Sequence, residues 1–197
     1  MAQCMDFRQL LFRYRSYTPI PFLIVMLIFA HPTIISLLAG FCIVAAGEFL
    51  RFWGVSIAGS ETRTTGPVGG TFLITRGPFS FVRNPLYLGN MMMYVGVGIM
   101  SNALFPWLAL AALCYFFWQY SQIVSLEEEY LATAFGDEYQ RYSRSVPRFM
   151  PTFIKFQPGT NPQPKLDWAS GVKSEMRTWQ AIGLLTLTLA VLWRLRG

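Results

Sequence analysis

Two clusters of polar residues stand out in a chain whose other long stretches are apolar. The first is Arg83-Asn84-Pro85, followed closely by Tyr87 and Gly89, and the second is the acidic run Glu127–Glu129. An arginine suits a carboxylate or phosphate because its guanidinium can donate two parallel hydrogen bonds, whereas carboxylates favour an ammonium or a sulfonium. If the two clusters meet, they predict a cleft with an arginine on one wall and carboxylates on the other.

The segment between the clusters indicates how they could meet. No charged residue occurs from Asn84 to Leu126, which is enough for two helices joined at the turn Ser101-Asn102. We predict these helices at Leu86–Met100 and Ala103–Leu126. A tight turn makes them antiparallel neighbours, so both polar clusters should return to the same face of the bundle.

The residues of the two clusters resemble motifs of a known family. The stretch TRGPFSFVRNPLYLGN (Thr75–Asn90) resembles the G-x-Y-x-x-x-R-H-P-x-Y-x-G motif of membrane methyltransferases. The stretch EEEYLATAFGDEYQRYSRSVPRFMP (Glu127–Pro151) resembles the E-E-x-x-L-x-x-x-F-G-x-x-Y-x-x-Y element that follows in them. The family is that of isoprenylcysteine carboxyl methyltransferases and phospholipid N-methyltransferases, and the resemblance covers about residues 47–151.

The resemblance implies a cofactor and the residues that hold it. Both groups of enzymes use S-adenosyl-L-methionine, and the matching positions imply cofactor binding by Thr71, Leu73, Arg83, Tyr87, Gly89, Glu127 and Glu128. The acidic pair is expected to hold the ribose or the cationic end of the cofactor. An arginine suits the cofactor's carboxylate.

Three further residues are candidates for catalysis. Glu48 and Arg51 lie three positions apart in a predicted helix, where they can pair. Ionisable residues at membrane depth are often functional, although a purely structural salt bridge is the other interpretation. Glu48, or a glutamate of the acidic pair, could take the proton that an amine acceptor must lose. Asn84 replaces the histidine of the family motif, and its amide can donate and accept hydrogen bonds.

One departure from the family bears on the acceptor. In the carboxyl methyltransferases a basic residue about one turn before the acidic pair is expected to bind the substrate carboxylate. Here that stretch is Gln119–Ser125, which contains no basic residue. Arg51 is the nearest remaining candidate, but Glu48 could already occupy it. We therefore expect an amine, or another acceptor that can be neutral, to fit more easily than a prenylcysteine carboxylate.

The elements that must position these residues are those of a membrane protein. Of the 197 residues, 53% are hydrophobic and 13% charged, about half the charged share of a typical soluble domain. Two more uncharged runs, 16–47 and 178–193, are typical of membrane-spanning helices. We predict a single all-α integral membrane domain over residues 1–197, with about five transmembrane helices and a cytoplasmic-side cofactor cleft. Besides the hairpin, its parts are helices at 18–30 and 33–57, a proline-rich connection at 146–164 and a C-terminal hydrophobic helix at 178–194.

The basic residues predict the orientation. All sixteen Lys and Arg except Arg194 and Arg196 lie on the side of the polar clusters, and the turns near His31 and Ser101 hold none. The positive-inside rule makes the cluster side cytoplasmic, in a bacterial inner membrane or the endoplasmic reticulum. The cofactor would then enter from the cytoplasm and a lipid or lipidated substrate from the bilayer. Whether the last hydrophobic segment spans is left open.

Other functional classes find less support in the sequence. The three cysteines form no CxxC pair, and with the single His31 they predict neither a disulfide framework nor a metal site. The net charge of +6 gathers on the membrane side that faces anionic headgroups, so it does not indicate nucleic acid. We predict methyl transfer to a lipid-like acceptor. The alternatives are an NADPH-dependent membrane reductase of the sterol type, which shares an R-x-P-x-Y-x-G segment but is generally larger, and a non-enzymatic membrane protein that kept the fold.

Overall fold

The computed structural model describes residues 7–59, 72–157, 159 and 163–196, and this part of the chain is all-helical. The elements are α1 (Phe7–Tyr14), α2 (Pro19–Ile28), α3 (Ile34–Ala58), the 3₁₀ helix η2 (Gly77–Ser80), α4 (Pro85–Ser101), α5 (Trp107–Ser145) and α6 (Trp168–Arg196). The all-α prediction is confirmed for the described residues.

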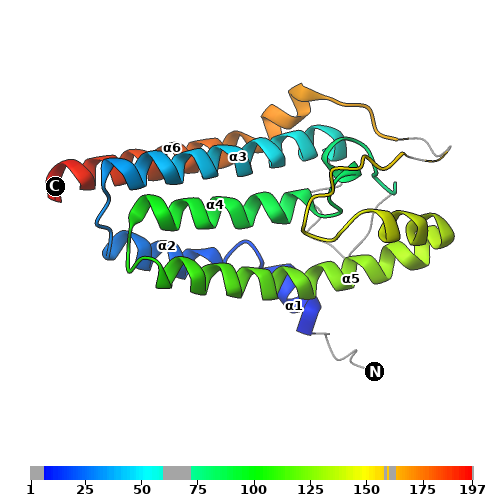
Figure 1. Ribbon diagram of the computed structural model, residues 1–197, viewed down its shortest axis with the longest axis horizontal. Coiled ribbons are helices and arrows are strands. Elements are labelled where there is room, and N and C mark those ends of the chain that lie inside the picture. Colours follow the sequence, from blue (N-terminus) through cyan, green and yellow to red (C-terminus); the bar gives the residue numbers. More distant parts are fainter. Residues whose placement is uncertain (1–6, 60–71, 158, 160–162, 197) are drawn as a thin grey trace.

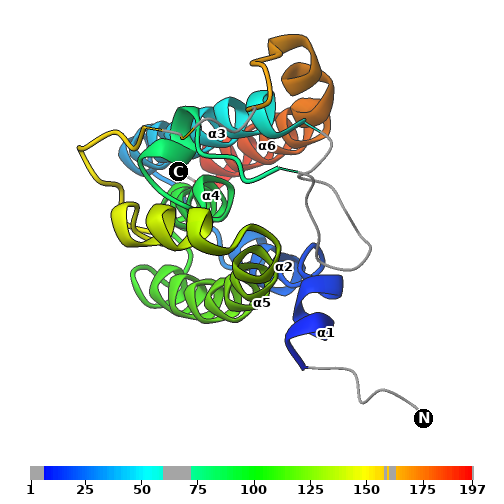
Figure 2. The ribbon, with the colours of Figure 1, turned by 90° about the vertical axis from the view of Figure 1, so that its right-hand side faces the viewer.

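The long helices lie roughly along one axis in three layers (Figure 1). Helices α3 and α6 form one layer, α4 lies in the middle, and α2 with the first part of α5 forms the third, as the view along the bundle also shows (Figure 2). The turns near His31 and Asn102 lie at one end of the bundle, and η2 lies at the other. Arg196 donates to the carbonyl of Ala30 over 2.7 Å, so α6 ends at the His31 turn.

Helices α3 and α4 pack with their backbones in contact. A Cβ at Gly40 would collide with the carbonyl oxygen of Gly96, and one at Gly47 would lie 2.7 Å from that of Gly89. The two contacts are seven residues apart in each helix, so they lie on one face. Small residues allow this close approach between helices, and the approach fixes the polar end of α3 against the start of α4.

The predicted hairpin is confirmed, with a longer turn than expected. Helix α4 matches its predicted range within one residue, but α5 begins at Trp107 rather than at residue 103. Asn102 ends α4 in the left-handed conformation, with φ of 49°, which asparagine tolerates better than most residues. Pro106 lacks an N–H group and therefore suits the start of a new helix rather than its interior.

Helix α5 continues past its predicted end and folds back at one glycine. Gly136 has φ of 48° and ψ of −124°, a combination that only glycine adopts readily. Beyond it the helix reverses direction (Figure 1), and Tyr139 and Tyr142 pack with Leu73 in a small second core. The Tyr142 hydroxyl donates to the carbonyl of Phe79 over 2.7 Å. Gly136 thereby returns the end of α5 to the segment that precedes α4.

Helix α6 is longer than the predicted helix at 178–194, which is a correction at its start. It begins at Trp168 because the Asp167 carboxylate accepts hydrogen bonds from the backbone N–H groups of Ala169 and Ser170, at 3.0 and 3.2 Å. An aspartate at this position caps a helix and satisfies its free donors. The connection at 146–164 contains no helix in its described residues, as predicted.

Two helices of the described part, α3 and α6, are long and apolar enough to cross a membrane. In the most apolar 18-residue stretch of each helix, 22% of the α3 residues and 6% of the α6 residues are buried, so neither resembles the core helix of a soluble protein. Helix α2 is apolar but has 10 residues, about 15 Å, which is half of a bilayer's hydrocarbon core. By length and composition, the described helices give two candidate spans rather than the expected five.

Candidate functional site

A cavity of about 270 Å³ lies among the ends of the helices near η2. This volume is close to the lower end of the range for small-molecule sites, about 300–1,000 Å³. All the long helices except α2 contribute to its lining, as do the end of α1 and the segment from residue 72 to α4. Seven of the predicted site residues line it: Arg51, Leu73, Arg83, Asn84, Tyr87, Glu127 and Glu128.

The other predicted site residues lie elsewhere. Gly89 does not line the cavity but faces α3, where a Cβ would lie 2.6 Å from Cγ of Arg51. Glu48 is buried between α3 and α6, where it accepts a hydrogen bond from the Trp179 indole over 2.6 Å. Thr71 lies outside the described residues.

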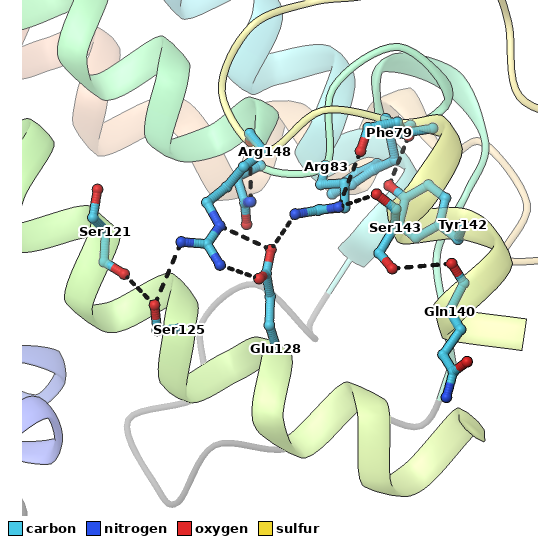
Figure 3. Close-up of polar contacts among 11 residues, drawn as sticks. Phe79, Arg83, Ser121, Ser125, Glu128, Gln140, Tyr142, Ser143 and Arg148 are labelled. Atoms are coloured by element: carbon cyan, nitrogen blue, oxygen red, sulfur yellow. Dashed lines mark hydrogen bonds and ion pairs between the residues drawn. The ribbon is translucent and has the colours of Figure 1, made fainter. Parts of the chain in front are cut away.

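On one side of the cavity, the Glu128 carboxylate lies between two arginines (Figure 3). Nη2 of Arg83 lies 3.0 Å from Oε1 of Glu128, and Arg148 donates to both oxygens of the same carboxylate. Arg83 also donates to the backbone carbonyls of Ser143 and Val146. Its Nε is buried without a hydrogen-bond partner in the described part of the chain. The arginine of the first motif and the acidic pair of the second are thus joined directly.

Glu127 has a different environment from Glu128. It follows the last residue of the uncharged run, Leu126, and accepts a hydrogen bond from the Tyr87 hydroxyl over 2.7 Å. Burial raises the pKa of the Glu127 carboxyl to about 7, although the Tyr87 hydrogen bond opposes that rise. A carboxyl that titrates near neutral pH can hold a cation when ionised and can exchange a proton.

A second ionic cluster lines the inner side of the cavity and joins three helices. Arg51 donates to both oxygens of Glu175, over 2.9 and 3.1 Å, and to the side-chain oxygen of Asn90. Nε of Arg51 lies 3.6 Å from Glu48, which Trp179 also holds. Two carboxylates therefore share one arginine, and with every group ionised the cluster carries a net negative charge.

Two charged residues of these clusters, Glu175 and Arg148, were not among the predicted site residues. Glu175 is completely buried against Arg51, but it lies in the first turns of α6, before the predicted start of that helix. The capping residue Asp167 was the available signal that the helix begins earlier. Arg148 stands within the second motif-like stretch, but only the reversal at Gly136 brings it to Glu128.

Comparison with known proteins assigns the class of this all-helical protein. The model of the phospholipid methyltransferase family matches residues 35–138, just over half of the chain. The chain therefore belongs to the phospholipid methyltransferase family, and the predicted resemblance is confirmed.

Individual relatives match in part. The chain is 33% identical over 102 residues to the cobalt-zinc-cadmium resistance protein CzcN of Cupriavidus metallidurans, a match that covers 51% of this chain and 42% of the relative. It is 32% identical over 79 residues to the protein-S-isoprenylcysteine O-methyltransferase of Schizosaccharomyces pombe, a match that covers 40% of this chain and 33% of the relative. It is 34% identical over 87 residues to the nickel-cobalt-cadmium resistance protein NccN of Alcaligenes xylosoxydans xylosoxydans, a match that covers 44% of this chain and 39% of the relative. The chain thus spans less than half the length of each of these relatives.

Proposed function

We propose that this protein transfers a methyl group from S-adenosylmethionine to a lipid-like acceptor at the membrane. The observation that carries the proposal is the junction of the two motifs: Arg83 and Tyr87 of the first contact Glu128 and Glu127 of the second across the same cavity. Membership of the phospholipid methyltransferase family supports the same reaction. One relative is named as a methyltransferase, whereas the names of the two resistance proteins state no reaction.

The chemistry of the cavity fits this cofactor. Glu127 and Glu128 offer carboxylates to a ribose or to a cationic group, and Nε of Arg83, which has no partner among the described residues, can donate to a carboxylate. Phe72 and Phe79 add aromatic surface on which an adenine ring can stack. When bound, S-adenosylmethionine supplies a methyl group activated by its positively charged sulfur.

The protein's own residues would mainly bind and align the reactants. Methyl transfer requires the acceptor atom in line with the methyl group, and fixed geometry of this kind can account for much of an enzyme's acceleration. Glu127 is the best-placed base for an amine acceptor, because a carboxyl with a pKa near 7 can take a proton at neutral pH. Asn84 lines the cavity and donates to the backbone carbonyl of Arg148 over 3.1 Å, which makes it a positioning residue. Glu48 would act similarly by holding Arg51.

The surroundings of Arg51 support an amine acceptor. A carboxylate substrate needs a cationic partner, and Arg51 is already engaged by Glu175 and Glu48. With both glutamates ionised, the net negative charge of this cluster favours a protonated amine that enters the cavity and then loses its proton. An aminolipid headgroup meets both requirements.

We also propose that the bundle is integral to the membrane, with the cavity on the cytoplasmic side. Helices α3 and α6 are long enough to cross, and α4 with the first part of α5 lies beside them over the same depth. Helix α2 would reach only part of the way. The basic residues of the cavity end would then face the cytoplasmic headgroups.

A radiolabelled methyl-transfer assay tests the proposal. Purified protein would receive labelled S-adenosylmethionine with either an aminolipid or a farnesylated cysteine analogue, at the same mole fraction in detergent. We expect faster labelling of the aminolipid, and loss of that labelling in Glu127→Gln but not in Glu129→Gln, since Glu129 is exposed and pairs with Arg8. Faster labelling of the farnesylated cysteine would contradict the amine acceptor, and labelling of neither would contradict methyl transfer to these classes of lipid.

A further inference from the structure

One face of α5 changes from apolar to charged toward the cavity. Phe117, Ser121, Ser125 and Glu128 follow one another at spacings of four, four and three residues, so they lie along one face of the helix. Phe117 is exposed and Glu128 lines the cavity. A lipid that lies along this face would meet apolar surface at its chains and polar groups at its head.

The segment after α5 extends this face on its outer side. Phe149 packs against Phe117 with ring centroids 5.5 Å apart. Met150, Phe153 and Ile154, which follow it, are 77%, 103% and 81% exposed, so these three apolar side chains contact almost nothing in the described part of the chain.

The backbone that carries these apolar side chains is held in place. The N–H group of Thr152 donates to the carbonyl of Phe81 over 2.8 Å, and that of Phe156 donates to Ser80 over 3.0 Å. The apolar side chains are therefore presented from a backbone fixed against the segment that precedes α4. Their continuity with the exposed face of α5 indicates that lipid chains cover them.

Arg148 stands where this apolar surface meets the cavity. It does not line the cavity itself, but it donates to Glu128, which does, and Nη1 makes a long contact of 3.4 Å with the Ser125 hydroxyl (Figure 3). A guanidinium has five N–H donors, and these contacts use three of them. The Arg148 side chain is also 38% exposed, against 13% for Arg83. Arg148 thus has two N–H donors that these contacts leave unused.

The local charge favours an anion at this point. Glu128 is the shared partner of Arg83 and Arg148, so the three side chains together carry one positive charge in excess. A phosphodiester carries one negative charge, and its oxygens match the donor geometry of arginine.

We propose that Arg148, with Ser125, binds the phosphate of a phospholipid whose acyl chains lie against Phe117, Met150 and Phe153. The headgroup beyond the phosphate then passes over Glu128 into the cavity. The assignment of this lipid as the methyl acceptor rests on the proposed function, whereas its binding does not. Arg148 is in this sense a positioning and specificity residue on the bilayer side of the site.

Lipid binding to the purified full-length protein tests the proposal without methyl transfer. The probes are a phosphatidylethanolamine and a diacylglycerol that carry the same fluorescent acyl chain, each titrated in uncharged detergent. In Arg148→Gln we expect about tenfold weaker binding of the phospholipid, the usual size of a lost charged hydrogen bond, and unchanged binding of the diacylglycerol. Arg148→Lys should recover part of the loss. Arg144→Gln is the matched control, because Arg144 is an exposed residue in the last turn of α5, just before the segment that carries Arg148.

Each alternative outcome contradicts the proposal. An equal loss for both lipids would show that Arg148 only supports the fold through Glu128, and no loss for either would place the phosphate elsewhere. Inorganic phosphate is added as a competitor, and displacement of the phospholipid at equal concentration would indicate a site for soluble phosphate rather than for a lipid headgroup. A parallel titration with S-adenosylmethionine tests the proposed function independently. If the protein does not bind S-adenosylmethionine but still distinguishes the two lipids, the proposed reaction is refuted and the lipid site is not.

Discussion

At the scale of single residues, adjacent glutamates have different electrostatic surroundings. Glu128 is held by Arg83 and Arg148, whereas Glu127 receives one hydrogen bond from a neutral tyrosine. Burial raises the pKa of the Glu127 carboxyl to about 7, although the Tyr87 hydrogen bond and the charge of Arg15 oppose that rise. Glu127 is therefore a group whose charge changes near neutral pH, whereas two arginines hold the Glu128 side chain in place.

The affinity for S-adenosylmethionine should depend on pH through Glu127. Its pKa of about 7 means that the carboxylate is largely ionised at pH 8 and largely protonated at pH 6. Because the ionised form attracts a cationic ligand, affinity should fall by up to about tenfold between these values. Calorimetric titrations across this range measure the effect, and Glu127→Gln should bind weakly at every pH. A wild-type affinity that rises on acidification would refute this role.

Glu48 should matter more for stability than for cofactor binding. It lies outside the cavity and contacts Arg51 and Trp179, so Glu48→Gln weakens the junction of α3 with α6. We expect a loss of about 1–3 kcal/mol, the usual cost of disturbing a buried charged hydrogen bond. Thermal unfolding in detergent and titration with S-adenosylmethionine separate the two effects. A large loss of affinity with unchanged thermal stability would restore Glu48 to a direct role in the site.

At the scale of elements, Gly136 should be the position in α5 at which an added side chain destabilises the protein most. Gly136→Ala places an ordinary residue at φ of 48° and ψ of −124°, which costs about 1–3 kcal/mol. The variant should unfold at lower temperature and bind S-adenosylmethionine more weakly, because Tyr139 and Arg148 reach the site through this reversal.

The same exchange at another glycine provides the control. Gly183 lies within α6, and a Cβ there would meet no other group of the described chain. Gly183→Ala should therefore be neutral or stabilise the helix by up to about 1 kcal/mol. Equal effects of the two substitutions would show that the conformation of Gly136 is unimportant.

The sequence alone predicts the hairpin and the contact between the two motifs, because both depend on features that lie close together in the chain. Uncharged runs define α4 and the start of α5, and a short connection forces their outer ends together, as the Tyr87–Glu127 hydrogen bond confirms. The sequence did not predict the contacts that depend on the reversal of a helix or on a helix that begins within a polar stretch. Arg148 needs the geometry of Gly136, and Glu175 needs α6 to begin at an aspartate cap among charged residues.

At the scale of the whole molecule, the distribution of basic residues predicts a defined orientation in the membrane. In a variant without its native cysteines, a new cysteine at Asn102 should react with an impermeant maleimide on intact cells. A cysteine at Ser145, the last residue of α5 and next to Val146, which Arg83 of the cavity contacts, should react only after permeabilisation. The reverse pattern would overturn the cytoplasmic location of the cavity.

We propose above all that the cavity between the two motifs binds S-adenosylmethionine. Isothermal titration of the purified protein with S-adenosylmethionine and, separately, with NADPH tests it most directly. We predict saturable binding of S-adenosylmethionine that Glu127→Gln weakens about tenfold or more, with no binding of NADPH. Saturable binding of NADPH without binding of S-adenosylmethionine would overturn this proposal and favour a reductase.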